Sequence, residues 1–344
     1  MLGPALRPYD DAVVVLGRDE IVAAGTADEV VLPRDVRTVD ATGTTVAPGF
    51  IDAHVHIGLA PPGSVVASGV TTVRDLAWPP DRIWKLVERS RAGDFSGPRI
   101  VAAGQMLTAP GGYPLSAAWA PPGTGRAVAG PTEAPPAVAD QADRGATVIK
   151  VALNPPAGPV LDASTLAAIV SAAHRRSLRV TGHVHGLTEL RKAVDAGVDE
   201  LAHMLMSTEA IPEGLLRRMV DQDMTIVPTL AVRFGRDRRI AVDNLRRFIA
   251  AGGRVVYGTD LGNAGPRPGI DPREVKAMAR AGMSPLDIIA SATVESARYL
   301  ELDATGVLGP GKLADIILLR GDATTDVKAL TRVEKVWRSG RLSP

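Results

Sequence analysis

Eight short runs of β-branched and other apolar residues recur through the middle of the chain, and helical or loop-like sequence separates each run from the next. The runs cover residues 50–56, 70–75, 99–104, 147–151, 179–183, 198–203, 225–229 and 255–260. Strands that alternate with helices form parallel βαβ units, and eight such units in one core predict an α/β fold of the (β/α)8, or TIM, barrel type. The length of 344 residues suffices for this barrel and a small accessory domain.

Helical patterns and one long connection fill the intervals between the runs. Helices are expected at residues 81–92, 163–176, 188–196, 212–222 and 284–291. The connection from residue 104 to about 137 is rich in glycine and proline and follows the third run, so it is interpreted as an active-site loop. An arginine-rich stretch at 233–247 is interpreted as a solvated helix face.

The two ends of the chain differ in character from its middle. Residues 1–48 and 305–344 contain short strand-like pieces, at 12–15, 20–23, 315–319 and 333–337, between glycine-containing turns. Neither end could bury a core alone. We therefore expect both ends to pair into one small composite β-sandwich, with the barrel formed by residues 49–304.

Composition excludes several classes of function. The chain has no cysteine, so any bound metal must be held by imidazole, carboxylate or a less usual ligand. The net charge of +1 and an aromatic content of 3% give little support for nucleic-acid binding. No apolar run approaches the ~18 residues of a membrane span, and the N-terminus lacks a signal-peptide pattern, so a cytoplasmic protein is expected. The expected partner is a small-molecule substrate, and the sequence leaves a homo-oligomer open.

Histidines stand at the ends of three of the predicted strands. His54 and His56 are two residues apart, which on a strand points both imidazoles the same way. His183 and His203 each close a further run, and Asp260 closes the eighth, which lies next to the first in a closed barrel. Any one of these histidines alone could be structural. Together they predict a metal site at the end of the barrel where active sites lie.

Lys150 is unusual because it interrupts an apolar strand. Desolvation there lowers the pKa of the lysine and favours the neutral amine, which can capture carbon dioxide. The resulting carbamate supplies two oxygens and a negative charge that could bridge two cations. The alternative is a lysine in a buried ion pair.

Two further residues are candidates for substrate contact. His185 lies two residues after His183, so on a strand it should also face inward. The other four histidines, the carbamate and Asp260 already complete a two-metal set, so His185 is expected behind the metal ligands or against substrate. Tyr113 lies on the 104–137 connection and is assigned to a substrate carbonyl or leaving group.

The segment 48–56, Lys150, the segment 180–186 around His183, His203 and the Gly-Thr-Asp ending at Asp260 together resemble the amidohydrolase superfamily. The resemblance is to its imidazolonepropionase-like and prolidase-like branch. The tail 309–316 is similar to the strand by which that branch returns to its sandwich, and the resemblance covers essentially the whole chain.

The resemblance implies a site with two divalent metal ions, with zinc as the expected ion. His54, His56 and Asp260 would hold one metal, and His183 and His203 the other. Carboxylated Lys150 and a hydroxide would bridge them. Two departures are present: Tyr113 stands where the branch often has a histidine, and the N-terminus is short of one expected sandwich strand, either because the sandwich is trimmed or because the start site is misplaced.

The expected reaction is hydrolysis of an amide-type carbon–nitrogen bond by the metal-bridged hydroxide, with Asp260 as general base. The substrate classes are a dipeptide, an N-acyl amino acid or a cyclic amide, with an Xaa-Pro-like dipeptide or N-acyl compound favoured. The alternatives are esterase, lactonase or phosphotriesterase activity at the same site, and a barrel that serves as a non-catalytic scaffold.

Overall fold

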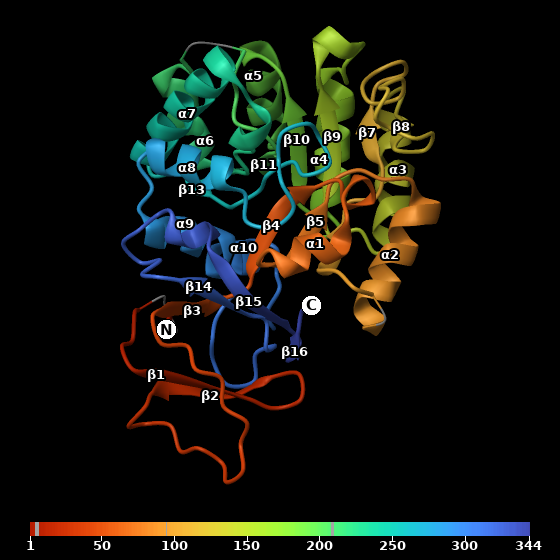
Figure 1. Ribbon diagram of the computed structural model, residues 1–344. Coiled ribbons are helices and arrows are strands. Elements are labelled where there is room, and N and C mark those ends of the chain that lie inside the picture. Colours follow the sequence, from red (N-terminus) through yellow and green to blue (C-terminus); the bar gives the residue numbers. More distant parts are fainter. Residues whose placement is uncertain (4–6, 94, 208–209) are drawn as a thin grey trace.

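Parallel strands with helices on their outer side make up most of the computed structural model, which describes residues 1–3, 7–93, 95–207 and 210–344 (Figure 1). A seven-stranded sheet has the order β13-β12-β11-β10-β9-β7-β8, and a three-stranded sheet has the order β4-β5-β6. All the strand pairs within these two sheets are parallel. The strands are β4 (Phe50–Val55), β5 (Val70–Asp75), β6 (Arg99–Ala102), β7 (Met106–Thr108), β8 (Gly125–Ala127), β9 (Ile149–Leu153), β10 (Val180–Val184), β11 (Glu200–Leu201), β12 (Thr225–Ile226) and β13 (Arg254–Val255).

Backbone hydrogen bonds connect the two parallel sheets on both sides. On one side, the amide of Ala53 in β4 donates to Tyr257 O at 2.9 Å, and the amide of Asp260 donates to His54 O at 2.8 Å. On the other side, the amide of Thr147 donates to Ala102 O in β6 at 3.0 Å. The segment after β13 therefore lies beside β4, and the segment before β9 lies beside β6.

Strands occur in all eight of the predicted runs, but the 104–137 connection differs from the loop that we expected. It contains β7 and β8, and β7 pairs with β9 so that Met106 lies opposite Lys150. Gly104 has a φ of 77°, a left-handed conformation that interrupts the strand between β6 and β7. The chain then resumes as a strand, which residues so rich in glycine and proline do not predict.

Ten α-helices are present in the described part of the chain. They are α1 (Pro62–Ala67), α2 (Pro80–Ala92), α3 (Ala134–Asp143), α4 (Ala163–His174), α5 (Leu187–Ala196), α6 (Glu213–Asp221), α7 (Gly235–Ala250), α8 (Pro272–Arg280), α9 (Pro285–Ala292) and α10 (Val294–Tyr299). The five predicted helices correspond to α2, α4, α5, α6 and α9, and the arginine-rich stretch forms most of α7. Within the described ranges, no helix combines the length and apolar character needed to cross a bilayer.

The chain ends form two antiparallel sheets beside each other (Figure 1). One contains β1 (Ala12–Leu16) and β2 (Ile21–Thr26), and the other has the order β16-β15-β14-β3. The strands of the second sheet are β3 (Thr44–Pro48), β14 (Ile316–Arg320), β15 (Val333–Arg338) and β16 (Arg341–Leu342), so β3 from the N-terminal end pairs with β14 from the C-terminal end. Ile21 and Ile316 belong to one small hydrophobic cluster, which brings the two sheets into contact.

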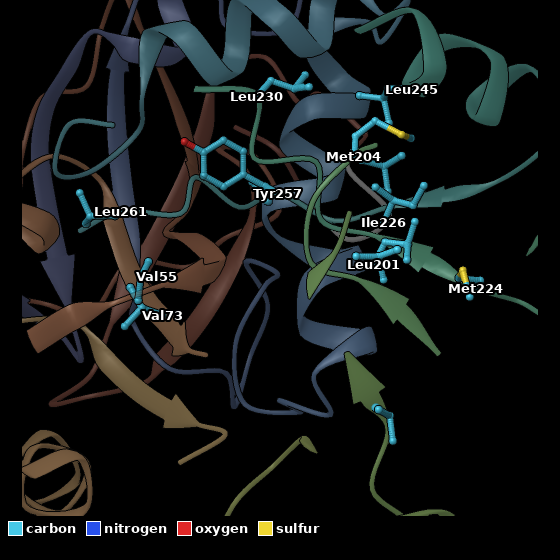
Figure 2. Close-up of a cluster of buried hydrophobic side chains, with 14 of the residues drawn as sticks. Val55, Val73, Leu201, Met204, Met224, Ile226, Leu230, Leu245, Tyr257 and Leu261 are labelled. Atoms are coloured by element: carbon cyan, nitrogen blue, oxygen red, sulfur yellow. The ribbon is translucent and has the colours of Figure 1, made fainter. Parts of the chain in front are cut away.

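The main hydrophobic core lies between the parallel strands and the helices around them. Leu201 of β11, Ile226 of β12 and Leu245 of α7 are fully buried in one cluster (Figure 2). Full burial of such a side chain stabilises the fold by about 1.5–3 kcal/mol relative to exposure. This packing holds the strands in place, and the histidines and Asp260 of the candidate site lie at or near the ends of these strands.

A buried ion pair crosses the interior between the two parallel sheets. Arg74 on β5 donates through Nη2 to both carboxylate oxygens of Glu200 on β11, at 2.7 and 2.8 Å. Arg74 Nε also donates to Ala53 O at 2.8 Å, and Thr181 Oγ1 donates to Glu200 Oε1 at 2.5 Å. Both charged side chains are almost completely buried, so the loss of either one would leave the other as an uncompensated charge and destabilise the fold.

Replacing Glu200 by Gln is therefore expected to lower the free energy of unfolding by about 3–5 kcal/mol, because it leaves the Arg74 charge buried without an ionic partner. Denaturant titration followed by circular dichroism measures the loss. Glu295→Gln is the control, because Glu295 pairs with the exposed Arg298 and exposed pairs contribute about 0–1 kcal/mol. Equal losses in the two variants would show that the buried pair has no special role.

Candidate metal centre

Two histidines at the end of β4 meet an aspartate from the segment after β13. His54 Nε2 and His56 Nε2 each lie 3.3 Å from Asp260 Oδ1. One ligand atom from each of the three residues falls within 4.8 Å of the others, and all three residues are buried. This is a donor set that a divalent cation such as zinc can use.

Two more histidines adjoin this group. His203 Nε2 lies 2.9 Å from His183 Nδ1, and the His203 ring centroid lies 4.8 Å from that of His54. His203 Nδ1 also lies 3.9 Å from Asp260 Oδ2. The side chains that the sequence places on four separate strand ends therefore converge in space.

Backbone carbonyls orient the first two histidines. His54 Nδ1 lies 2.8 Å from Ala202 O, and His56 Nδ1 lies 3.2 Å from Ala77 O. Donation by each Nδ1–H leaves the Nε2 lone pair facing Asp260, which is the arrangement that supports metal ligation. His54 Nε2 and Asp260 Oδ1 are both buried and have no hydrogen-bond partner among the described residues. Buried polar atoms without partners are costly, so a cation fits this position well.

Lys150 reaches the same cavity from β9. Its side chain is fully buried, and its Nζ has neither a hydrogen bond nor an ion pair to another described residue. The alternative of a buried ion pair is therefore not what the geometry shows. Burial lowers the pKa of Lys150 to about 7, despite the opposing charges of Asp260 and Glu200. A substantial fraction of the amine is therefore neutral near pH 7, which is the form that reacts with carbon dioxide.

The surroundings also favour neutral imidazoles, which are the form that binds metal. Burial, assisted by neighbouring positive charge, holds the pKa of His54, His183 and His203 well below the usual value. Burial also acts to lower the pKa of His56, but the Asp260 and Asp75 carboxylates and the Ala77 carbonyl together outweigh it, so the net direction is upward. Because cation and proton compete for the same nitrogen, the centre is suited to a metal at neutral pH.

The two predicted substrate residues lie around this centre. The Tyr113 ring centroid is 4.9 Å from that of His183, and the tyrosine lines the central cavity of about 300 Å³ together with the histidines, Lys150 and Asp260. His185 lines a smaller adjoining pocket of about 140 Å³.

Three contributors to the site were missed in the sequence. The Trp119 ring centroid lies 4.7 Å from that of His56, and its Nε1 donates to Tyr113 Oη at 3.0 Å. Thr229 Oγ1 lies 2.7 Å from His203 Nδ1. Arg233 does not lie on the solvated helix face that the sequence predicts for residues 233–247, because it precedes α7 and lines the cavity. Its place four residues after the seventh predicted strand, within reach of the strand ends, was the available signal.

An α/β protein with imidazole and carboxylate groups gathered at the ends of parallel strands has the framework of a metal-dependent enzyme. The chain belongs to the amidohydrolase family, whose family model matches residues 45–343. It is accordingly an enzyme that acts on carbon–nitrogen bonds, and its hydrolase relatives support hydrolysis of amide-type bonds.

Several relatives match this chain over different shares of its length. It is 26% identical to an ochratoxinase of Aspergillus niger, over 98% of this chain and 83% of the relative. It is 31% identical to an imidazolonepropionase of Deinococcus deserti, over 50% of this chain and 43% of that protein. Among solved structures, an Xaa-Pro dipeptidase with bound methionine in its active site matches with a TM-score of 0.81 and 25% identity, over 96% of this chain and 94% of that one.

Proposed function

We propose that the protein is a binuclear metal-dependent amidohydrolase. The proposed ligands are His54, His56, His183, His203, Asp260 and a carbamate formed on Lys150, with two zinc ions as the expected metals. The observation that carries the proposal is the convergence of four histidines and Asp260 on a cavity that Lys150 enters without a partner.

In this proposal the residues of the chain divide the chemistry among them. Two bound cations would lower the pKa of water and polarise the scissile carbonyl. Asp260 accepts the proton of the attacking water and then donates it to the departing nitrogen, so the proton returns to product and the carboxylate is regenerated. Tyr113 lies within the cavity where its hydroxyl can donate to the substrate carbonyl or leaving group.

The same proposal includes the domain arrangement. Backbone hydrogen bonds on both sides of the three-stranded sheet support a closed (β/α)8 barrel over residues 49–304. The pairing of β3 with β14 and the shared cluster of Ile21 and Ile316 support a composite sandwich of residues 1–48 and 305–344. The sandwich would tie the two chain ends to the far side of the barrel.

The substrate is proposed to be a small molecule with an amide-type bond: a dipeptide, an N-acyl amino acid or a cyclic amide. The likeness of the chain to an ochratoxinase, an imidazolonepropionase and an Xaa-Pro dipeptidase supports this range. Esters, lactones and phosphotriesters are the alternative substrates, because the same activated water attacks them.

A substrate panel tests the proposal. Protein prepared with zinc and bicarbonate is assayed against dipeptides, N-acyl amino acids, cyclic amides, esters, lactones and phosphotriesters. We expect chelator-sensitive hydrolysis with the highest kcat/KM on an amide. Higher kcat/KM on a phosphotriester or ester than on every amide would reassign the reaction.

A further inference from the structure

Arg233 lies where two cavities meet. It lines the central cavity with His183, His203 and Asp260, and it also lines the adjoining pocket of about 140 Å³ that holds His185. The residue follows the 3-10 helix Leu230–Val232, just before α7. The lining of both cavities places the Arg233 side chain beside His183 and His203.

The Arg233 charge is unpaired within the described part of the chain. The residue is partly buried, and its Nε is buried without a hydrogen-bond partner among the described residues. The negative charges of three acidic groups act to raise the pKa of Arg233. These groups are Asp260, Asp237 and Glu274, and none of them forms an ion pair with it. Asp260 faces the histidines. Burial raises the pKa of Glu274 to about 8, despite its hydrogen bonds from the backbone of residues 230 and 231, so this carboxyl carries little charge at neutral pH. An unpaired, partly desolvated guanidinium is costly unless a ligand supplies the anion.

The smaller pocket has an amphipathic lining. Val184, Met204, Leu205 and Met206 provide apolar surface, whereas Asn154 Oδ1 is buried and has no hydrogen-bond partner among the described residues. Asn154 follows β9 and can accept an N–H group of a bound molecule. The pocket thus offers an apolar surface, a hydrogen-bond acceptor and, at its junction with the central cavity, a guanidinium.

We propose that Arg233 is a specificity residue that binds the free carboxylate of an amino-acid leaving group, whose apolar side chain enters the pocket lined by Val184 and Met206. The leaving amine faces Asn154, and the scissile bond lies in the central cavity. This inference rests on the proposed hydrolase function and narrows its substrates to N-acyl amino acids and dipeptides with a small apolar C-terminal residue, and it disfavours neutral cyclic amides.

Binding of a cleavage product tests the subsite without turnover. L-Leucine and L-leucinol share the amine and the side chain, and they differ only in that leucinol has a hydroxymethyl group in place of the carboxylate. We expect the metal-loaded enzyme to bind L-leucine about 10- to 100-fold more tightly in an NMR titration, as a charge-assisted hydrogen-bonded pair provides. Arg233→Met should abolish this preference while keeping the apolar stem. Arg233→Lys should restore part of it, because lysine keeps the charge but loses the two-pronged geometry.

Turnover gives a second readout. N-acetyl-L-leucine is compared with N-(3-methylbutyl)acetamide, which has the same scissile bond and no carboxylate. Arg233→Met should reduce kcat/KM for the first compound by about 10- to 100-fold and leave the second little changed. Arg239→Met is the matched control, because Arg239 is exposed on α7 and lines only an outer surface hollow. A third compound, N-(3-methylbutyl)succinamic acid, carries its carboxylate on the acyl side.

The possible results distinguish an error in the Arg233 subsite from an error in the proposed amide hydrolysis. Equal binding of L-leucine and L-leucinol, or equal losses on the two acetamides in Arg233→Met, would overturn the subsite. Faster cleavage of the succinamic acid than of N-acetyl-L-leucine would also overturn the assignment to the leaving group. Absence of amide hydrolysis together with an Arg233-dependent preference for L-leucine would contradict the proposed reaction and support the subsite.

Discussion

Replacing Asp260 by Asn is expected to lower kcat by about 10²- to 10⁴-fold, the contribution typical of a positioned general acid–base group. The reason is the role proposed for the carboxylate, which takes a proton from the attacking water and returns it to the departing nitrogen. An amide cannot accept that proton. Steady-state kinetics on the best amide of the substrate panel measures the effect.

The fold should tolerate this substitution, which makes the experiment selective. Asp260 has a φ of 61°, in the left-handed region that only a few residue types enter readily. Asparagine is one of them, so Asp260→Asn adds little backbone strain. The amide also keeps an oxygen at the position 3.3 Å from the Nε2 atoms of His54 and His56, so most of the metal should remain bound.

Asp243→Asn is the control for Asp260→Asn. Asp243 is an exposed residue of α7 that pairs with Arg246, and the change removes the same charge far from the centre. We expect its kinetics to equal those of the parent enzyme. Near-normal turnover in Asp260→Asn, with metal content verified by elemental analysis, would refute the general-base role.

The sequence predicted the strand ends of the site well because the relevant signals are local. A strand of alternating residues places His54 and His56 on one side, and apolar runs ending in His183, His203 and Asp260 mark further strand ends. The parallel α/β class then requires those ends to lie at one edge of the sheets. Local pattern and general topology together were sufficient to group these side chains.

Contacts that depend on loop conformation were not predictable in this way. Trp119 reaches His56 only because the connection after β6 returns over the cavity, and its path includes two short strands that glycine and proline content concealed. The sequence predicts Arg233 to be part of the helix that follows it, because a continuous arginine-rich stretch is typical of a solvent-exposed helix face. Its actual position depends on a 3-10 turn, which no periodic pattern indicates.

The terminal sheets illustrate a third case. The strand-like pieces that became β1, β2, β14 and β15 were recognised, but β3 was not, because its apolar content is low. Its partner β14 lies more than 250 residues later, and such a pairing is stabilised by the contact itself rather than by local propensity. Local residue patterns therefore contain little information about the pairing of β3 with β14.

Replacing Lys150 by Met is expected to reduce the metal content from near two ions per chain to one or less, and to abolish amide hydrolysis. The parent protein is purified with added bicarbonate, and elemental analysis of parent and variant gives the metal content. Lys150 Nζ is buried beside the histidines without a hydrogen bond or ion pair among the described residues, and the proposed carbamate would put two metal-binding oxygens in place of this unpartnered amine. Methionine keeps the apolar stem and removes the amine that would form the carbamate.

Metal content alone would not separate a lost ligand from a damaged fold, so the stability of the metal-free proteins decides between these causes. Burial disfavours the charged form of Lys150 and lowers its pKa to about 7, and an apolar side chain removes this cost. Metal-free Lys150→Met should therefore unfold at the same denaturant concentration as the metal-free parent, or at a higher one. Lys192→Met is the control, since the Lys192 amine donates to Leu161 O beside a surface hollow between α4 and α5, and its metal content should not change. Two metals per chain retained in Lys150→Met would exclude the carbamate bridge, whereas metal loss with undiminished stability would assign the bridging role to this one side chain.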